Sequence, residues 1–287
     1  MITNTAIDDG SKKLLRDSLC ALESELNADV LTFHFEIGTG VDDIVKVLIE
    51  EISTDANKHD TLFVILTTPG GSLNPLKRIV TVFRHFYNKV NFIIPDYAYS
   101  AGTILALSGD EIWMNYYSAL GPVDPQVQTK DGHFVAALGY LDKVNEMIEK
   151  AKNNDLTKAE FMILRDQDLA QLREFEQARD LAVDLIEGWL VTYKFRDWTQ
   201  HKDGRLVTAD EKTARAHEIA AKLGNNNDWK SHSRPISMQE LEEMHLKIHD
   251  YYEDKKVKEL IENYYGMVID YMRMKKYQSF VQTRRHV

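Results

Sequence analysis

Two glycine-rich turns, and the serine within the second of them, are the residues of this sequence best suited to chemistry. The first turn covers residues 68–71 (Thr-Pro-Gly-Gly) and the second covers 99–102 (Tyr-Ser-Ala-Gly). A serine at a sharp strand-to-helix turn exposes its hydroxyl, and the N–H of the following residue can point toward an oxyanion. Glycines at a neighbouring turn can supply a second N–H without a side chain in the way. Together they predict acyl transfer by Ser100, with the oxyanion held by Gly70, Gly71 and Ala101.

Short apolar strands that alternate with helices must bring these two turns together. Residues 61–67 contain five consecutive apolar residues just before Pro69, which is typical of a strand buried on both faces. This alternation indicates parallel βαβ units, in which ligands lie at the carboxyl ends of the strands. Both glycine turns fall at such ends. Further strands are predicted at 29–35, 90–95 and 111–115, and helices at 14–26, 41–52, 76–86 and 101–107.

The second half of the chain is predicted to be mostly helical. Capping boxes begin at Thr157, Thr208 and Ser237, and the first of them starts an apolar periodicity that predicts one long helix to about residue 190. Such a helix is better suited to packing or oligomer formation than to catalysis. We expect a catalytic core over 1–150, a helical segment that completes it over 151–250, and a peripheral C-terminal tail over 251–287.

The composition excludes several classes of protein. A net charge of −10 disfavours non-specific binding to nucleic acid or to an anionic membrane. No apolar run approaches the roughly 18–20 residues of a membrane span, and the first ten residues lack a signal-peptide pattern. The single cysteine, Cys20, excludes intrachain disulfides and cysteine-rich metal sites, and its helix predicts a buried packing role. We expect a cytoplasmic protein with no metal, no organic cofactor, no nucleic-acid partner and no membrane span.

Three ordered motifs give the sequence a family resemblance. TPGGS at 68–72, SAGT at 100–103 and LGPVDPQ at 120–126 resemble the Clp protease/crotonase superfamily. More narrowly, the chain resembles the cytosolic serine dehydrogenase proteinase family, relatives of the signal peptide peptidases, over most of residues 15–250. The resemblance implies an α/β fold of repeated βαβ units with parallel strands and a helical C-terminal half. It also implies a serine peptidase that acts on peptides or proteins as a homo-oligomer. Whether an unfoldase or adaptor delivers substrates stays open.

By this resemblance Ser100 is the nucleophile, with Gly70 and Ala101 as oxyanion donors, but the general base is not settled. A serine hydroxyl is barely ionised at neutral pH, so a base is required. The Clp proteolytic subunit has a histidine in the stretch where this chain has Asp124, so the sequence departs from that triad.

Two residues can replace the missing histidine. His232, oriented by Asp124, would restore a triad with the acid and the histidine exchanged in chain order. Lys143 would instead form a Ser–Lys dyad of the signal peptide peptidase kind, provided that burial lowers its pKa. We favour His232, because the segment 229–236 around it has little other reason for its composition.

Two other functions remain open on the sequence alone. A crotonase-like acyl-coenzyme A enzyme would use the same oxyanion hole but form no covalent serine adduct. A non-catalytic scaffold or regulator would keep the fold, and Ser100→Ala would leave its biological effect unchanged.

Overall fold

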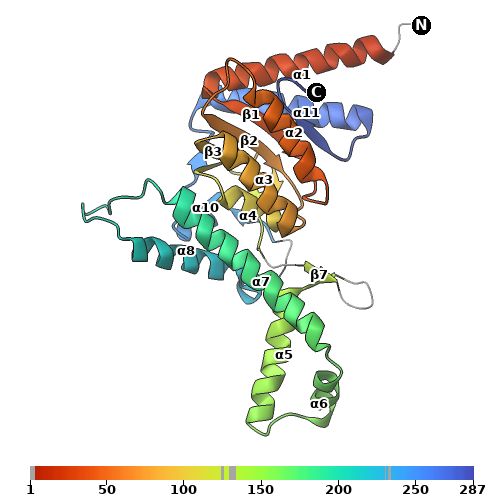
Figure 1. Ribbon diagram of the computed structural model, residues 1–287, viewed down its shortest axis with the longest axis vertical. Helices are drawn as coiled ribbons and strands as arrows, with labels where there is room; N and C mark the ends of the chain where they lie inside the picture. Colours follow the sequence, from red (N-terminus) through yellow and green to blue (C-terminus); the bar gives the residue numbers. More distant parts are fainter. Residues whose placement is uncertain (1–3, 124–125, 129–133, 230, 232–233) are drawn as a thin grey trace.

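A central six-stranded sheet organises the computed structural model, which describes residues 4–123, 126–128, 134–229, 231 and 234–287 (Figure 1). The strand order is β10-β5-β3-β2-β1-β11; the first five are parallel, and β11 runs antiparallel to β1. This confirms the predicted α/β fold with parallel strands. The bounds are β1 (Asp29–His34), β2 (Thr61–Thr67), β3 (Lys89–Ile93), β5 (Glu111–Met114), β10 (His249–Asp250) and β11 (Phe280–Gln282).

Strand β2 lies inside the sheet and is buried on both faces, as its apolar run predicted. Its side chains alternate between two cores, because successive residues of a strand point to opposite faces. Leu62, Val64 and Leu66 enter one core. Phe63 and Ile65 enter the other. The sheet therefore needs helices on both sides.

Helices cover both faces of the sheet (Figure 1). The core that contains Leu66 also contains side chains from α2 (Val41–Ser53), α3 (Leu73–Phe86) and α4 (Ala101–Leu107). On the opposite face, α1 (Asn4–Leu26) and α11 (Lys255–Lys275) pack against each other and against the sheet. Because α1 and α11 come from the two ends of the sequence, the chain closes on itself.

The interpretation of residues 251–287 as a peripheral tail is wrong. Helix α11 buries Tyr264 completely in the second core, and β11 hydrogen-bonds to β1 within the sheet. Directly after β11, the half-buried Arg284 forms ion pairs with Glu23, Asp29 and Asp55, at 3.0, 2.8 and 2.9 Å. Lys275 and Arg285 likewise pair with carboxylates distant in sequence, Asp8 and Asp55, so this segment is not a solvated tail.

The helical segment departs from the prediction at one point, since the long helix is divided in two. It breaks at residues 166–168, where Asp168 accepts hydrogen bonds from the N–H groups of Ala170 and Gln171 and so caps the second part. The predicted capping boxes at Thr157, Thr208 and Ser237 are all confirmed. The helices are α5 (Ala137–Lys152), α6 (Lys158–Arg165), α7 (Leu169–Trp189), α8 (Ala209–Gly224), α9 (Asn226–Trp229) and α10 (Met238–Glu243), with a π-helix, η1 (Leu190–Lys194), after α7.

Helices α5 and α6 project away from the sheet, whereas the C-terminal half of α7 reaches back to it (Figure 1). Ala182, Leu185 and Ile186 of α7 join the core beneath α4. A hairpin of β7 (Gln126–Gln128) and β8 (Phe134–Ala136) leads into α5. Within the described part of the chain, no helix is both long and apolar enough to cross a membrane.

The single cysteine was expected to be a buried packing residue, and this is wrong. Cys20 is exposed, because it lies on the solvent side of α1 between the buried Leu19 and Leu22.

Candidate active site

A small second sheet extends the carboxyl end of the main sheet and carries the predicted nucleophile. It consists of β4 (Tyr97–Ala98), β6 (Ala119–Leu120) and β9 (Ile236–Ser237) in that order. Strand β4 is tied to the end of β2, because Thr68 donates its N–H to Tyr97 and accepts one from Tyr99, at 3.1 and 3.0 Å. Ser100 follows at once and is the residue that precedes α4.

Ser100 has an unusual backbone conformation. Its φ is 53° and its ψ is −118°, a combination that a residue with a side chain rarely adopts. Such a conformation costs about 1–3 kcal/mol and persists only where the surroundings impose it. Here the imposing contacts are hydrogen bonds from Gly102 N–H to the Tyr99 carbonyl and from Thr103 N–H to the Ser100 carbonyl, at 2.8 and 2.9 Å. The strain places the hydroxyl at a sharp turn, as the sequence predicted.

The first glycine turn lies against this serine. A Cβ atom on Gly70 would come within 2.8 Å of Ser100 Cβ and 2.6 Å of the Tyr99 carbonyl oxygen. Its φ of 108° is a second reason why only glycine fits there. The structure therefore brings Gly70 and Ser100 into direct contact.

The two turns differ in which N–H groups are available. Gly70 is buried, and its N–H donates to Thr68 Oγ1 at 3.1 Å. Gly71 is exposed. Neither the Gly71 N–H nor the Ala101 N–H donates a hydrogen bond to any described residue. The N–H groups of the exposed Gly71 and the buried Ala101 are thus the unengaged donors of the two turns, among the described residues.

Thr103 joins the third motif to the second. Its buried hydroxyl lies 2.9 Å from the Ala98 carbonyl and 2.8 Å from the Gly121 carbonyl, and it accepts the Gly121 N–H at 2.9 Å. A Cβ on Gly121 would lie 2.8 Å from the ring of Tyr99. All three sequence motifs therefore meet around Ser100.

None of the residues predicted to act as the base, or to orient it, is seen in contact with Ser100 in the described part of the chain. Asp124 and His232 lie outside the described residues. Lys143 is exposed on α5, and its Nζ lies 2.8 Å from Glu146 Oε2. Within the described residues, the Ser100 hydroxyl has no hydrogen-bond partner.

Sequence reasoning missed a titratable pair at the same end of the sheet. His34 ends β1, opposite Thr67 of β2, and its buried Nδ1 has no partner among the described residues. Burial lowers the pKa of His34, and the nearby Asp96 acts in the opposite direction. Burial likewise raises the pKa of Asp96, against the influence of His34. His34 ends β1 and Asp96 follows β3, and the two meet only in the folded chain, so no local sequence pattern could have identified the pair.

Comparison with known proteins gives a family match over most of the chain. Residues 39–282 match the family described as "ClpP-like SDH-type serine proteinase". Two uncharacterized proteins of Methanocaldococcus jannaschii are each 30% identical, over 201 and 148 residues, which is 70% and 48% of this chain. The chain spans 56% and 50% of the length of these curated relatives.

Two solved structures of a membrane-bound stomatin-specific protease are also similar. One is a serine-to-alanine variant, with 18% identity and a TM-score of 0.31 over 41% of this chain and 60% of that one. The other is a lysine-to-alanine variant in complex with a substrate peptide, with 20% identity and a TM-score of 0.33 over 43% of this chain and 61% of that one.

Proposed function

The chain belongs to the ClpP-like SDH-type serine proteinase family, and we propose that it hydrolyses peptide bonds through an acyl-enzyme on Ser100. The observation that carries the proposal is the strained backbone of Ser100 beside two N–H groups that have no acceptor among the described residues. Backbone donors fixed before reaction stabilise the developing oxyanion without reorganising.

In the proposed reaction, Ser100 Oγ attacks the substrate carbonyl while a base takes its proton. The negative charge that develops on the carbonyl oxygen is held by the N–H groups of Gly71 and Ala101. The base then returns the proton to the leaving amine, and water hydrolyses the acyl-enzyme. Gly70 serves this site by its lack of a side chain rather than by its N–H, which is engaged with Thr68.

We propose His232 as the base and Asp124 as the residue that orients it. Two anchors support this. Ile236 of β9 pairs with Leu120 of β6, which in turn pairs with Ala98 of β4, next to the Ser100 turn. His232 comes four residues before Ile236, and Asp124 four residues after Leu120. Four residues span at most about 13–14 Å, and this bound on the chain from each anchor supports the proposal.

Lys143 is the alternative base, but it would have to move from its present position to reach Ser100. It would have to leave Glu146, and α5 projects away from the sheet (Figure 1). The approach of a second subunit is one way to bring such a helix to a site. Exposed apolar side chains near the tip of this projection support a homo-oligomer: Phe161, Met162, Ile163 and Leu169.

Covalent labelling tests the proposed nucleophile. A fluorophosphonate should react with the wild-type protein, and peptide mass spectrometry should locate the adduct on Ser100, because only an activated serine displaces the fluoride. Labelling is measured on each oligomeric species after size-exclusion chromatography. If no species is labelled, the peptidase proposal fails, and the result supports the acyl-coenzyme A enzyme or the non-catalytic protein instead.

The base is tested by paired variants. His232→Ala should lower kcat for a cleaved peptide by about 10²–10⁴-fold, the usual contribution of general acid–base catalysis. Lys143→Met should change kcat by less than about threefold, as a control on an exposed residue. The reverse ranking would assign the role to Lys143, and an equal small effect of both variants would exclude both residues.

A further inference from the structure

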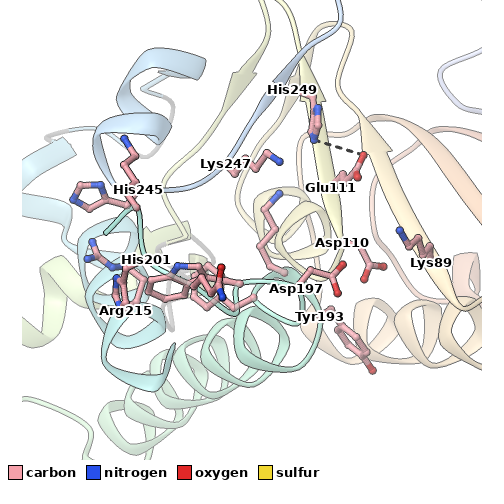
Figure 2. A pocket seen from close by; sticks show the side chains of 15 residues that line it. Lys89, Asp110, Glu111, Tyr193, Asp197, His201, Arg215, His245, Lys247 and His249 are labelled. Carbon is pink, nitrogen blue, oxygen red and sulfur yellow. Dashed lines mark ion pairs between the residues drawn. The ribbon is translucent and has the colours of Figure 1, made fainter. Parts of the chain in front are cut away.

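A pocket of about 600 Å³ lies at the amino ends of strands β3 and β5 (Figure 2). It is bordered by Lys89 and Glu111, the first residues of β3 and β5. Ser100 follows β4, beyond the carboxyl ends of the parallel strands. The pocket therefore plays no part in the acyl-transfer site.

A π-helix supplies two of the side chains that line the pocket. In η1 the chain makes one wide turn, closed by the hydrogen bond from Phe195 N–H to the Leu190 carbonyl at 2.8 Å. Two contacts hold the turn in place. The Arg84 guanidinium carbon lies 3.6 Å from the centroid of the Tyr193 ring, and Lys212 Nζ donates a hydrogen bond to the Arg196 carbonyl at 3.2 Å. Short π-helices are frequently found at functional sites. This one turns Tyr193 and Lys194 toward the pocket.

The pocket has a surplus of positive charge. Asp110 is already paired with Arg84 and Arg196, both at 2.6 Å. By contrast, neither Lys194 nor Lys247 forms an ion pair with any carboxylate in the part of the chain that the structure describes. A bound anion would supply the negatively charged partner that these two ammonium groups lack.

Glu111 offsets only part of this surplus, since it is a single carboxylate facing two ammonium groups. One of its carboxylate oxygens accepts the Trp113 indole N–H at 2.9 Å and lies 3.7 Å from His249 (Figure 2). Burial lowers the pKa of Lys194 to about 8, Glu111 opposes this, and Lys247 lowers it further. Lys194 is thus a poorly solvated amine beside a second cation.

Aromatic side chains form another part of the wall. Trp198 and Phe195 both line the pocket, with ring centroids 5.6 Å apart in an edge-on arrangement. The rings of His201 and Trp198 are also edge-on, with centroids 5.6 Å apart. These rings give the otherwise polar and charged lining one apolar wall, against which the body of a small molecule can pack.

We propose that this pocket binds a small organic anion, whose phosphate or carboxylate is held by Lys194 and Lys247 and whose body packs against Trp198. The phosphate and the carboxylate share one chemistry here, a compact anion between two ammonium groups. The site is independent of the proposed peptidase activity, since no residue of the acyl-transfer site lines it.

Pyridoxal 5′-phosphate is a suitable probe for this site, since it combines a planar ring, a phosphate and an aldehyde. The aldehyde condenses with an unprotonated lysine amine, releasing one water, and borohydride then delivers hydride to the imine carbon to leave a stable secondary amine. Mass spectrometry locates the modified lysine. At pH 7.5 and low reagent concentration, we expect Lys194 to be modified ahead of the other lysines, because its pKa is lowered to about 8.

Competition tests whether the pocket holds anions. Inorganic phosphate and citrate, each compared with sodium chloride at equal ionic strength, should protect Lys194 from modification. Protection by phosphate alone identifies a phosphate ligand, and protection by citrate alone identifies a carboxylate ligand. Lys247→Gln should raise the concentration needed for half protection about tenfold, the usual effect of losing one charge-assisted hydrogen bond.

Lys77→Gln is the matched control, because Lys77 is exposed on α3, remote from the pocket lining, and should leave protection unchanged. Circular dichroism checks that each variant is folded. Three results would overturn the proposal. They are modification spread evenly over the exposed lysines, protection of Lys194 by neither anion, and an anion concentration for half protection that is the same in Lys247→Gln as in the wild type. Ser100→Ala should behave as wild type throughout, which separates this test from that of the peptidase.

Discussion

Replacing Ser100 by alanine is expected to lower kcat/KM for a cleaved peptide at least about a thousandfold, because the substitution removes the hydroxyl on which the proposed acyl-enzyme forms. The oxyanion donors stay in place, so a small residual rate above that of water is also expected. The Cβ atom and the contacts with Gly70 are retained, and so is the strained turn. The loss should therefore appear in kcat, measured with a fluorogenic peptide, at an unchanged melting temperature.

Ser72 provides the matched control for that experiment. It follows Gly71, is exposed, and its side chain makes no capping hydrogen bond with α3. Ser72→Ala should keep kcat/KM within about twofold of wild type, because the exposed side chain forms no capping hydrogen bond and the backbone of Gly71 is unchanged. The proposal would be contradicted if Ser100→Ala retained most of its activity, or if Ser72→Ala lost it.

Arg284→Ala is expected to lower the free energy of unfolding by about 3–5 kcal/mol, the usual cost of removing one partner from a buried ion pair. Arg284 is 16% exposed and contacts three carboxylates from different parts of the chain: Glu23 of α1, Asp29 of β1 and Asp55 after α2. Without the guanidinium, Asp29 in particular stays buried without a cation. Urea denaturation followed by circular dichroism measures the change.

Arg285 offers the comparison within the same segment. Its side chain is 44% exposed and pairs with Asp55 alone. Arg285→Ala should cost less than about 1 kcal/mol, as surface ion pairs do. Equal losses in the two arginine variants would show that the Arg284 network is not the source of the stability.

The sequence predicts those elements whose pattern is local. The apolar run of β2 and the three capping boxes depend on neighbouring residues, and the structure has all of them. The break at Asp168 was not predicted, since the apolar periodicity continues across it. The role of Arg284 was not predicted either, because its partners lie more than 220 residues away. Whether a charged segment is solvated or forms ion pairs depends on residues elsewhere in the chain, which the sequence of the segment does not reveal.

The candidate site divides in the same way. A strand, a tight turn and a helix around Ser100 are visible in the sequence, and so is the nearby glycine pair. Which glycine N–H is free depends on the hydrogen bond between Gly70 and Thr68, which is a matter of geometry. The His34–Asp96 pair depends on how the segments after β1 and β3 meet in the fold, and the Lys194 pocket depends on a π-helix. None of these leaves a signal in residue spacing.

The position of β11 bears on how the protein is made. Strand β1 is synthesised early, but its outer edge is covered only when Phe280–Gln282 pairs with it, and Asp29 gains its cation only with Arg284. Until then the nascent chain carries an open strand edge, the kind of surface that pairs with other chains. Folding during translation is thus incomplete until nearly the last of these residues leaves the ribosome, and a chain interrupted before residue 280 is expected to be prone to aggregation.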